Sequence, residues 1–210
     1  MRIESITRLE KKQDKFAALF DDGAKIIVSA AQIADFGLYT GREISLEEFE
    51  ELSEGIKLST SKVRAVHILG NRNYSSREMQ KRLERKGDAK ETASQTVKWL
   101  EDTGLVSDSE YASAIVRHYY EKGYGLAKIK DELFRRGIGR DEWEEALNGL
   151  DGMEKTAYDF LMKKLRGERD EKTLRKATEM LCRRGFSYEQ ARTALSMYLE
   201  SVEENEAEEP

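Results

Sequence analysis

Cysteine, proline and histidine are nearly absent from this sequence, and it has no long apolar run. Its 210 residues include one cysteine, one proline and two histidines. The lone Cys182 can form neither an internal disulfide nor a thiolate metal cluster, which is typical of a reducing cytoplasm. No apolar run approaches the ~20 residues of a membrane helix, and Glu4 stands where a signal peptide would begin its apolar stretch. We therefore expect a cytoplasmic protein outside the membrane.

Motifs of catalysis and metal binding are also missing. The sequence has no Gly-x-x-x-x-Gly-Lys phosphate loop, no His-Glu-x-x-His pattern and no cysteine pair at metal spacing. His67 and His118 have no second histidine or carboxylate pair spaced to work with them. Cys182 follows Leu181 in an apolar register and is predicted to be a buried thiol. We therefore expect no enzyme activity, no catalytic residue, no cofactor and no metal site.

Charged residues are abundant, at 37%, but the two signs are distributed unevenly along the chain. Residues 1–59 carry 8 basic and 12 acidic side chains, residues 60–200 carry 28 and 24, and the last ten carry five glutamates and no base. The middle of the chain is thus mildly basic between two acidic ends. Because a dedicated nucleic-acid domain is usually strongly basic, any nucleic-acid contact is expected to be shared with another partner.

The beginning of the sequence predicts a small α+β module over residues 1–57. Two or three strands and one short helix are predicted, over residues 3–9, 16–20, 25–29 and 30–36. Ser45 and Glu48 have the spacing of a capping box and open a second helix, which is predicted to end near Ile56.

A motif that ends in glycine occurs three times after residue 60. The copies are Leu83-Glu84-Arg85-Lys86-Gly87, Leu133-Phe134-Arg135-Arg136-Gly137 and Leu181-Cys182-Arg183-Arg184-Gly185, with glycines 50 and 48 residues apart. Ten positions after each glycine stands an aliphatic residue, at Val97, Leu147 and Leu195. Thirteen positions after it stand Leu100, Leu150 and Tyr198. These coincident offsets predict an internal repeat.

Each copy is predicted to form three helices, with a left-handed glycine at the end of the second. In the middle copy the helices are expected at about 108–122, 125–137 and 139–149. One such unit buries little, so stacked copies should share their apolar faces. The predicted fold is mainly α, with three tandem three-helix repeats forming an elongated curved array behind the N-terminal module. The expected boundaries are 60–106, 107–151 and 152–202, followed by a disordered acidic tail at 203–210.

A basic pair precedes the glycine in every copy, and it has two compatible explanations. Cations in the last turn of a helix gain about 0.3–1 kcal/mol from the helix dipole. Repeated at a fixed offset, the pairs would also place a row of cations along one edge of the array, where they could follow phosphates or an acidic surface. Tyr120 and Tyr124 fall off the apolar face beside Arg117 and Lys122, and they are further candidates for a contact surface.

These residues resemble the signature of a known family. The central pattern of RecX, the bacterial modulator of the RecA recombinase, is similar to Asp108-x-x-Tyr111-Ala112, Val116-Arg117, Gly123-x-Gly125, Ile129, Glu132-Leu133 and Arg136-Gly137-Ile138. The first-repeat pattern of that family is similar to Tyr74-Ser75-x-x-Glu78 with Leu83 and Lys86-Gly87. The resemblance is close over residues 60–150 and looser in the third copy, where Thr178-Glu179 stands in place of Lys130-Asp131.

The resemblance implies a non-enzymatic protein that binds in the groove of the RecA–DNA filament. It would bridge successive RecA protomers and restrain ATP hydrolysis, strand exchange and RecA-stimulated cleavage of the SOS repressor during DNA repair. We expect a monomer that contacts DNA only together with RecA. The predicted contact residues are Arg85, Lys86, Arg117, Tyr120, Lys122, Tyr124, Lys128, Arg135, Arg136, Arg183 and Arg184.

Two other functions are compatible with the sequence. Stacked three-helix units can resemble helix-turn-helix modules, so the first alternative is an independent nucleic-acid-binding protein. The net charge of only +4 over residues 60–200 disfavours it. The second alternative is an adaptor that recognises acidic peptides.

Overall fold

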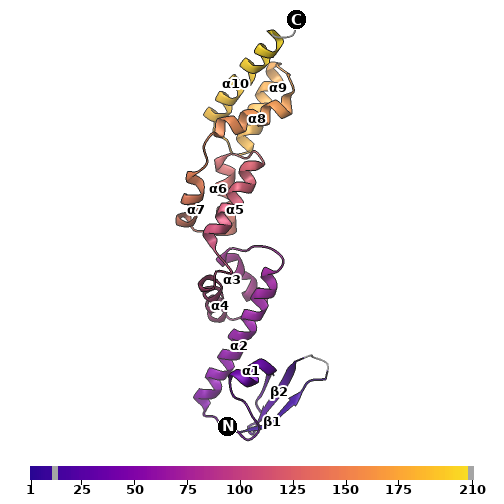
Figure 1. The fold of residues 1–210 in the computed structure, drawn as a ribbon, viewed down its shortest axis with the longest axis vertical. Helices are drawn as coiled ribbons and strands as arrows, with labels where there is room; N and C mark the ends of the chain where they lie inside the picture. The colour runs from indigo at the N-terminus through magenta and orange to yellow at the C-terminus, as the bar shows by residue number, and fades with distance from the viewer. Residues whose placement is uncertain (11–13, 208–210) are drawn as a thin grey trace. The chain divides into compact units, whose positions relative to one another are not determined.

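The computed structural model describes residues 1–10 and 14–207, and its residue contacts divide into two compact units. The first unit comprises residues 1–72 and 79–105, and the second comprises residues 73–78 and 106–210. Within the described ranges there are three strands and ten helices (Figure 1). The predicted mainly helical fold with a small α+β start is therefore confirmed.

The first unit begins with an antiparallel sheet in the order β1-β2-β3, followed by the short helix α1 (Ala30–Asp35). The strands are β1 (Ile3–Arg8), β2 (Lys15–Phe20) and β3 (Lys25–Ser29), as the sequence predicts. Ala17 of β2 lies opposite Thr7 of β1 and Ile27 of β3, which fixes the register. Side chains of the sheet share one core with the helix that follows α1. This core includes Ile3, Phe20 and Val28 of the sheet and Leu52 and Ile56 of that helix.

A single helix, α2 (Leu46–Leu69), runs through the place where the sequence predicted a helix end near Ile56, so that prediction is wrong. Its start is as predicted, because the Ser45 hydroxyl accepts from the Glu48 amide and the Glu48 carboxylate accepts from the Ser45 amide. Gly55 does not end the helix but serves its packing, since a Cβ there would lie 2.7 Å from the Phe36 ring. The helix contains no proline that would stop it.

The first three-helix copy consists of the second half of α2, α3 (Ser76–Arg85) and α4 (Lys90–Asp102). Thr96 of α4 donates a hydrogen bond of 2.8 Å to the Ser61 hydroxyl on α2, and Ser61 donates one of 2.8 Å to Asp88. Asp88 also pairs with Arg64. Because these groups are shielded from water, each needs its partner, and together they fix α4 and the loop before it against α2.

The second unit holds the other two copies of the repeat. Its six complete helices are α5 (Asp108–Glu121), α6 (Leu126–Arg136), α7 (Arg140–Asn148), α8 (Met153–Leu165), α9 (Glu171–Arg183) and α10 (Tyr188–Ala207). In all three copies a glycine with positive φ follows the second helix, at 96° for Gly87, 74° for Gly137 and 93° for Gly185. The predicted three-helix pattern with its left-handed glycine is confirmed.

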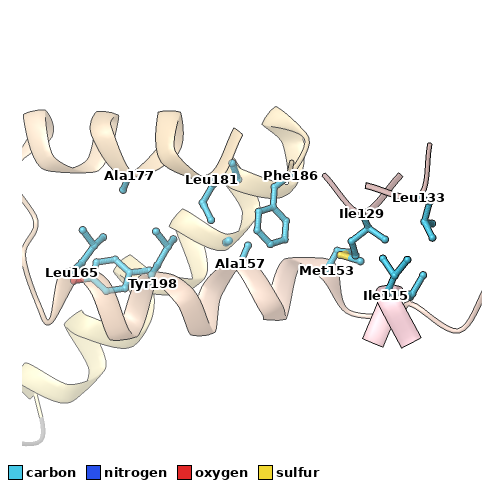
Figure 2. Close-up of a cluster of buried hydrophobic side chains, with 14 of the residues drawn as sticks. Ile115, Ile129, Leu133, Met153, Ala157, Leu165, Ala177, Leu181, Phe186 and Tyr198 are labelled. Carbon is cyan, nitrogen blue, oxygen red and sulfur yellow. The ribbon is translucent and has the colours of Figure 1, made fainter. Parts of the chain in front are cut away.

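One continuous hydrophobic core joins the two copies in the second unit. Figure 2 shows it passing from Ile115 and Ile129 through Met153 to Ala157 and Tyr198. Tyr198, at the position thirteen residues after Gly185, is fully buried. Sharing one core keeps these copies together as a single body, as the sequence argument for stacked copies expects.

Two predictions on this unit are wrong. Helix α10 reaches Ala207, so residues 203–207 are helical rather than disordered, while residues 208–210 lie outside the described residues. The glutamates there are good helix formers, and Val202 anchors that end of the helix in the core. Cys182 is exposed rather than buried. The buried face of α9 is formed by Ala177 and Leu181, and the next position along the chain turns away from it.

No helix in the described ranges is both long enough and apolar enough to cross a membrane.

Candidate binding surface

The basic pairs Arg135-Arg136 and Arg183-Arg184 lie at the carboxyl ends of α6 and α9 in the second unit. Within each pair the two side chains have different surroundings. The first arginine is exposed, and the second is half-buried. In the first unit the equivalent pair, Arg85-Lys86, is exposed at the end of α3.

Arg136 is engaged by groups of its own unit. Its Nε donates to Oε1 of Glu132 at 2.8 Å, and its Nη1 donates to the Tyr111 hydroxyl. The same Nη1 lies 3.8 Å from Oε1 of Glu78. The side chain thus links α6 to α5 and to the start of α3, which leaves few of its donors for a partner molecule.

Glu132 is a fully buried carboxylate at the centre of these contacts. Burial by itself would raise the pKa of Glu132, but hydrogen bonds from Arg136 and Arg135 outweigh burial and hold the pKa below its usual value. Burial and the nearby Glu132 carboxylate raise the pKa of Tyr119. The negative charge of Glu132 therefore persists inside the protein and orients both arginines.

Arg184 is also engaged, mainly by residues of the neighbouring copy of the repeat. Its Nε donates to the Gly123 carbonyl at 3.0 Å and its Nη2 to the Lys122 carbonyl at 2.6 Å. The guanidinium carbon lies 4.3 Å from the ring centres of both Tyr124 and Phe160. These carbonyls close α5, so the cation of one copy caps a helix of the other.

The exposed first arginines each have an exposed aromatic side chain nearby. Phe134, next to Arg135, is 71% exposed, and the Arg135 side chain is 67% exposed although it also pairs with Glu132. Arg183 lines a shallow hollow of about 530 Å³ together with Tyr188, which is 69% exposed. Cations and accessible rings therefore occur together at the end of α6, and again where α9 ends and α10 begins.

The other predicted contact residues are less uniform. Arg117 is exposed on α5, and Lys122 is exposed at the end of that helix. The Nζ of Lys128 lies 3.5 Å from Oδ2 of Asp131. The Tyr120 hydroxyl donates to the Asp151 carbonyl at 2.9 Å, and the centres of the tilted Tyr124 and Tyr119 rings lie 5.3 Å apart. Both tyrosines thus contribute to folding of the unit, while parts of their surface stay accessible.

Sequence reasoning missed Phe134, Tyr188 and Glu132. Phe134 stands between Leu133 of the buried face and Arg135, so helical periodicity alone could have placed it outside. The burial of Glu132 had a weaker signal, since its position three and four residues before two arginines is also common on exposed helices. In the described part of the chain, no three His, Cys, Asp or Glu side chains are grouped to hold a metal ion.

Residues 107–147, which span α5, α6 and most of α7, match the family model described as RecX, second three-helix domain. The regulatory protein RecX of Streptococcus gordonii is 31% identical over 208 residues, covering 97% of this chain and 81% of that protein. The regulatory protein RecX of Chromohalobacter salexigens is 34% identical over 134 residues, covering 63% of this chain and 88% of that protein.

Solved structures support the fold. A crystal structure of a regulatory protein RecX aligns with a TM-score of 0.69 at 19% identity and covers 91% of this chain and 97% of that one. The crystal structure of RecX from Lactobacillus salivarius aligns with a TM-score of 0.60 at 22% identity. That alignment covers 68% of this chain and 96% of that one.

Proposed function

Because this chain belongs to the RecX family, whose relatives carry the name regulatory protein, we propose that it is a non-enzymatic regulator that binds the RecA–DNA filament. In this proposal it occupies the groove of the filament and restrains ATP hydrolysis, strand exchange and SOS-repressor cleavage by RecA. DNA is contacted only as part of the filament.

The observation that carries this proposal is the pair of exposed arginines, Arg135 and Arg183, at equivalent positions of two copies that share one core. A shared core holds the two cations at a fixed separation, and fixed cations suit a partner whose negative charges recur regularly, as those of a filament do. Phe134 and Tyr188 add apolar area beside the cations, which is typical of the anchors of protein interfaces.

The test is to titrate the protein into RecA filaments on single-stranded DNA and follow ATP hydrolysis. Reversing the charges of Arg135 and Arg136 together would not distinguish a lost contact with RecA from a damaged fold, because Arg136 donates to Glu132 and Tyr111. The sharper variant is Arg135→Gln with Arg183→Gln, because a carboxylate at position 135 would repel the buried Glu132, whereas an amide can still donate to it. It should raise the concentration needed for half-inhibition about tenfold, since two contacts of roughly 0.7 kcal/mol each sum to about 1.4 kcal/mol.

A matched control neutralises two exposed cations elsewhere in the same unit, Lys164→Gln on α8 and Arg192→Gln on α10. This control changes the net charge equally and should inhibit like the parent protein. Equal inhibition by both double variants would reject the proposed surface, and no inhibition by the parent protein would reject the proposed function.

Independent binding of single-stranded nucleic acid is a second candidate, favoured by the exposed rings of Phe134 and Tyr188 beside arginines. Bases stack on such rings while cations contact the phosphates. A gel shift at physiological salt without RecA decides between the candidates, because only an independent binder retains the nucleic acid there. Sedimentation with an acidic protein but not with RecA would instead favour an adaptor.

A further inference from the structure

The second helices of successive copies meet end to end within the second unit, through the residues that surround the repeated glycine. At the downstream junction, defined as Gly123–Lys128 against Arg184–Gly185, the amide of Gly125 donates to the Arg184 carbonyl at 2.9 Å. The amide of Ala127 donates to the Gly185 carbonyl at 3.1 Å. The end of α9 thus supplies the acceptors that the first amides of α6 lack inside their own helix.

The downstream junction leaves no room for side chains. A Cβ on Gly125 would lie 2.2 Å from the backbone carbon of Gly185, and a Cβ on Gly185 would lie 2.4 Å from the Lys128 amide nitrogen. Both obstacles are backbone atoms, which cannot rotate away as a side chain can. The two helices are therefore held at one separation by direct backbone contact.

Arg184 closes this junction from outside. Its two hydrogen bonds to the carbonyls of Lys122 and Gly123, and its position 4.3 Å from the Tyr124 ring, tie the turn before α6 to the end of α9. Its other face lies 4.3 Å from the Phe160 ring of α8. Arg183, the preceding residue, is exposed and makes none of these contacts. Adjacent arginines with the same charge thus meet different surroundings.

We propose that Arg184 is a positioning residue that, with Gly125 and Gly185, sets the distance between the exposed Arg135 and Arg183. In the pair Arg183-Arg184 the second residue then joins two copies of the repeat and the first faces the partner. The contact role of the first residue rests on the proposed function. The positioning role is independent of any partner.

The distance between α6 and α9 can be measured directly, because the chain contains one cysteine and that cysteine is exposed. Cys182 of α9 is equivalent to Phe134 of α6, which is exposed as well. The variant Phe134→Cys therefore gives two sites for spin labels, and pulsed electron spin resonance on the full chain should return one narrow distance distribution.

Arg184→Ala in this labelled background should broaden or shift that distribution well below the melting temperature, whereas Arg183→Ala should leave it unchanged. Arg184→Lys keeps the charge but lacks the planar fork that reaches two carbonyls while stacking on two rings, so it should broaden the distribution too. It also serves as the second variant if Arg184→Ala does not fold. An unchanged distribution in Arg184→Lys, or a broadened one in Arg183→Ala, would overturn the positioning role.

The same variants without labels are then added to RecA filaments. For Arg183→Ala, severalfold more protein should be needed for half-inhibition of ATP hydrolysis, although the distance between α6 and α9 is unchanged. Arg184→Ala should lose both the inhibition and the narrow distance distribution. If neither loses inhibition while Arg184→Ala still broadens the distance, the contact surface is rejected and the positioning role stands.

Discussion

The downstream junction and its counterpart one repeat earlier involve equivalent positions of the sequence repeat, but different atoms make the contacts. The upstream junction, defined as Ser75–Glu78 against Arg136–Gly137, lies in the same compact unit. There the Ser75 hydroxyl donates to the Arg136 carbonyl at 2.6 Å, and a Cβ on Gly137 would meet the Arg77 side chain at 2.5 Å.

Side chains mediate the upstream junction, whereas backbone meets backbone at the downstream one. Ser75 stands fifty residues before Gly125, at the equivalent position of the repeat. Equivalent positions of a repeated sequence motif can therefore make their contacts through different atoms. A side-chain junction can adjust to a substitution by rotation, and a backbone junction cannot.

The largest effect should follow from breaking the backbone contact. Gly125→Ala should lower the free energy of unfolding by about 3 kcal/mol, because its methyl group must displace backbone atoms. Gly149→Ala is the matched control, since no atom lies within 4 Å of a Cβ there, and it should be neutral or slightly stabilising. Urea denaturation followed by circular dichroism measures both, and equal stability of the two variants would contradict the rigid junction.

Glu132→Gln should cause a somewhat smaller loss of unfolding free energy, because it weakens contacts between side chains. A neutral amide cannot hold both Arg135 and Arg136, and the cost should be roughly 2 kcal/mol, below that of a fully buried ion pair because both arginines retain access to water. Glu144→Gln, on the exposed surface of α7, is the control and should change stability by less than about 0.5 kcal/mol. Thermal unfolding of both variants checks this.

Ser75→Ala should weaken the upstream junction by about 1–1.5 kcal/mol. The hydroxyl donates to the Arg136 carbonyl and also accepts from the Glu78 amide at 3.1 Å, so the change removes a cap and a junction contact together. Ser113→Ala, on the exposed surface of α5, should be near neutral. A Ser75 variant as stable as the Ser113 variant would show that the hydroxyl does not stabilise the upstream junction.

The smallest effect concerns pH. The pKa of Glu132 in the folded protein lies below its ordinary value of 4.5, so its contribution to stability is present above that value and disappears as the pH falls through the folded pKa. The difference in unfolding free energy between the parent protein and Glu132→Gln should be constant near neutral pH and should decrease below pH 4.5. A difference that stays constant down to acidic pH would show that the carboxylate is not held in its charged form.

Much of this fold could be predicted from local patterns. The strand segments, the capping box at Ser45 and the three glycine-terminated helices depend on chemistry between residues close in sequence, and the structure has them where the patterns place them. The end of α2 and the burial of Cys182 were predicted wrongly, because both depend on what packs against the helix, which local patterns do not contain.

The repeat, its helices and the family can be recognised in the amino-acid sequence alone, because periodicity, glycine conformation and motif spacing are properties of short segments. Which arginine of the pairs 135–136 and 183–184 is exposed depends on the packing of the folded chain. Arg183 and Arg184 are neighbours with the same chemistry, and they differ because the carbonyls and rings around Arg184 come from residues far away in the chain.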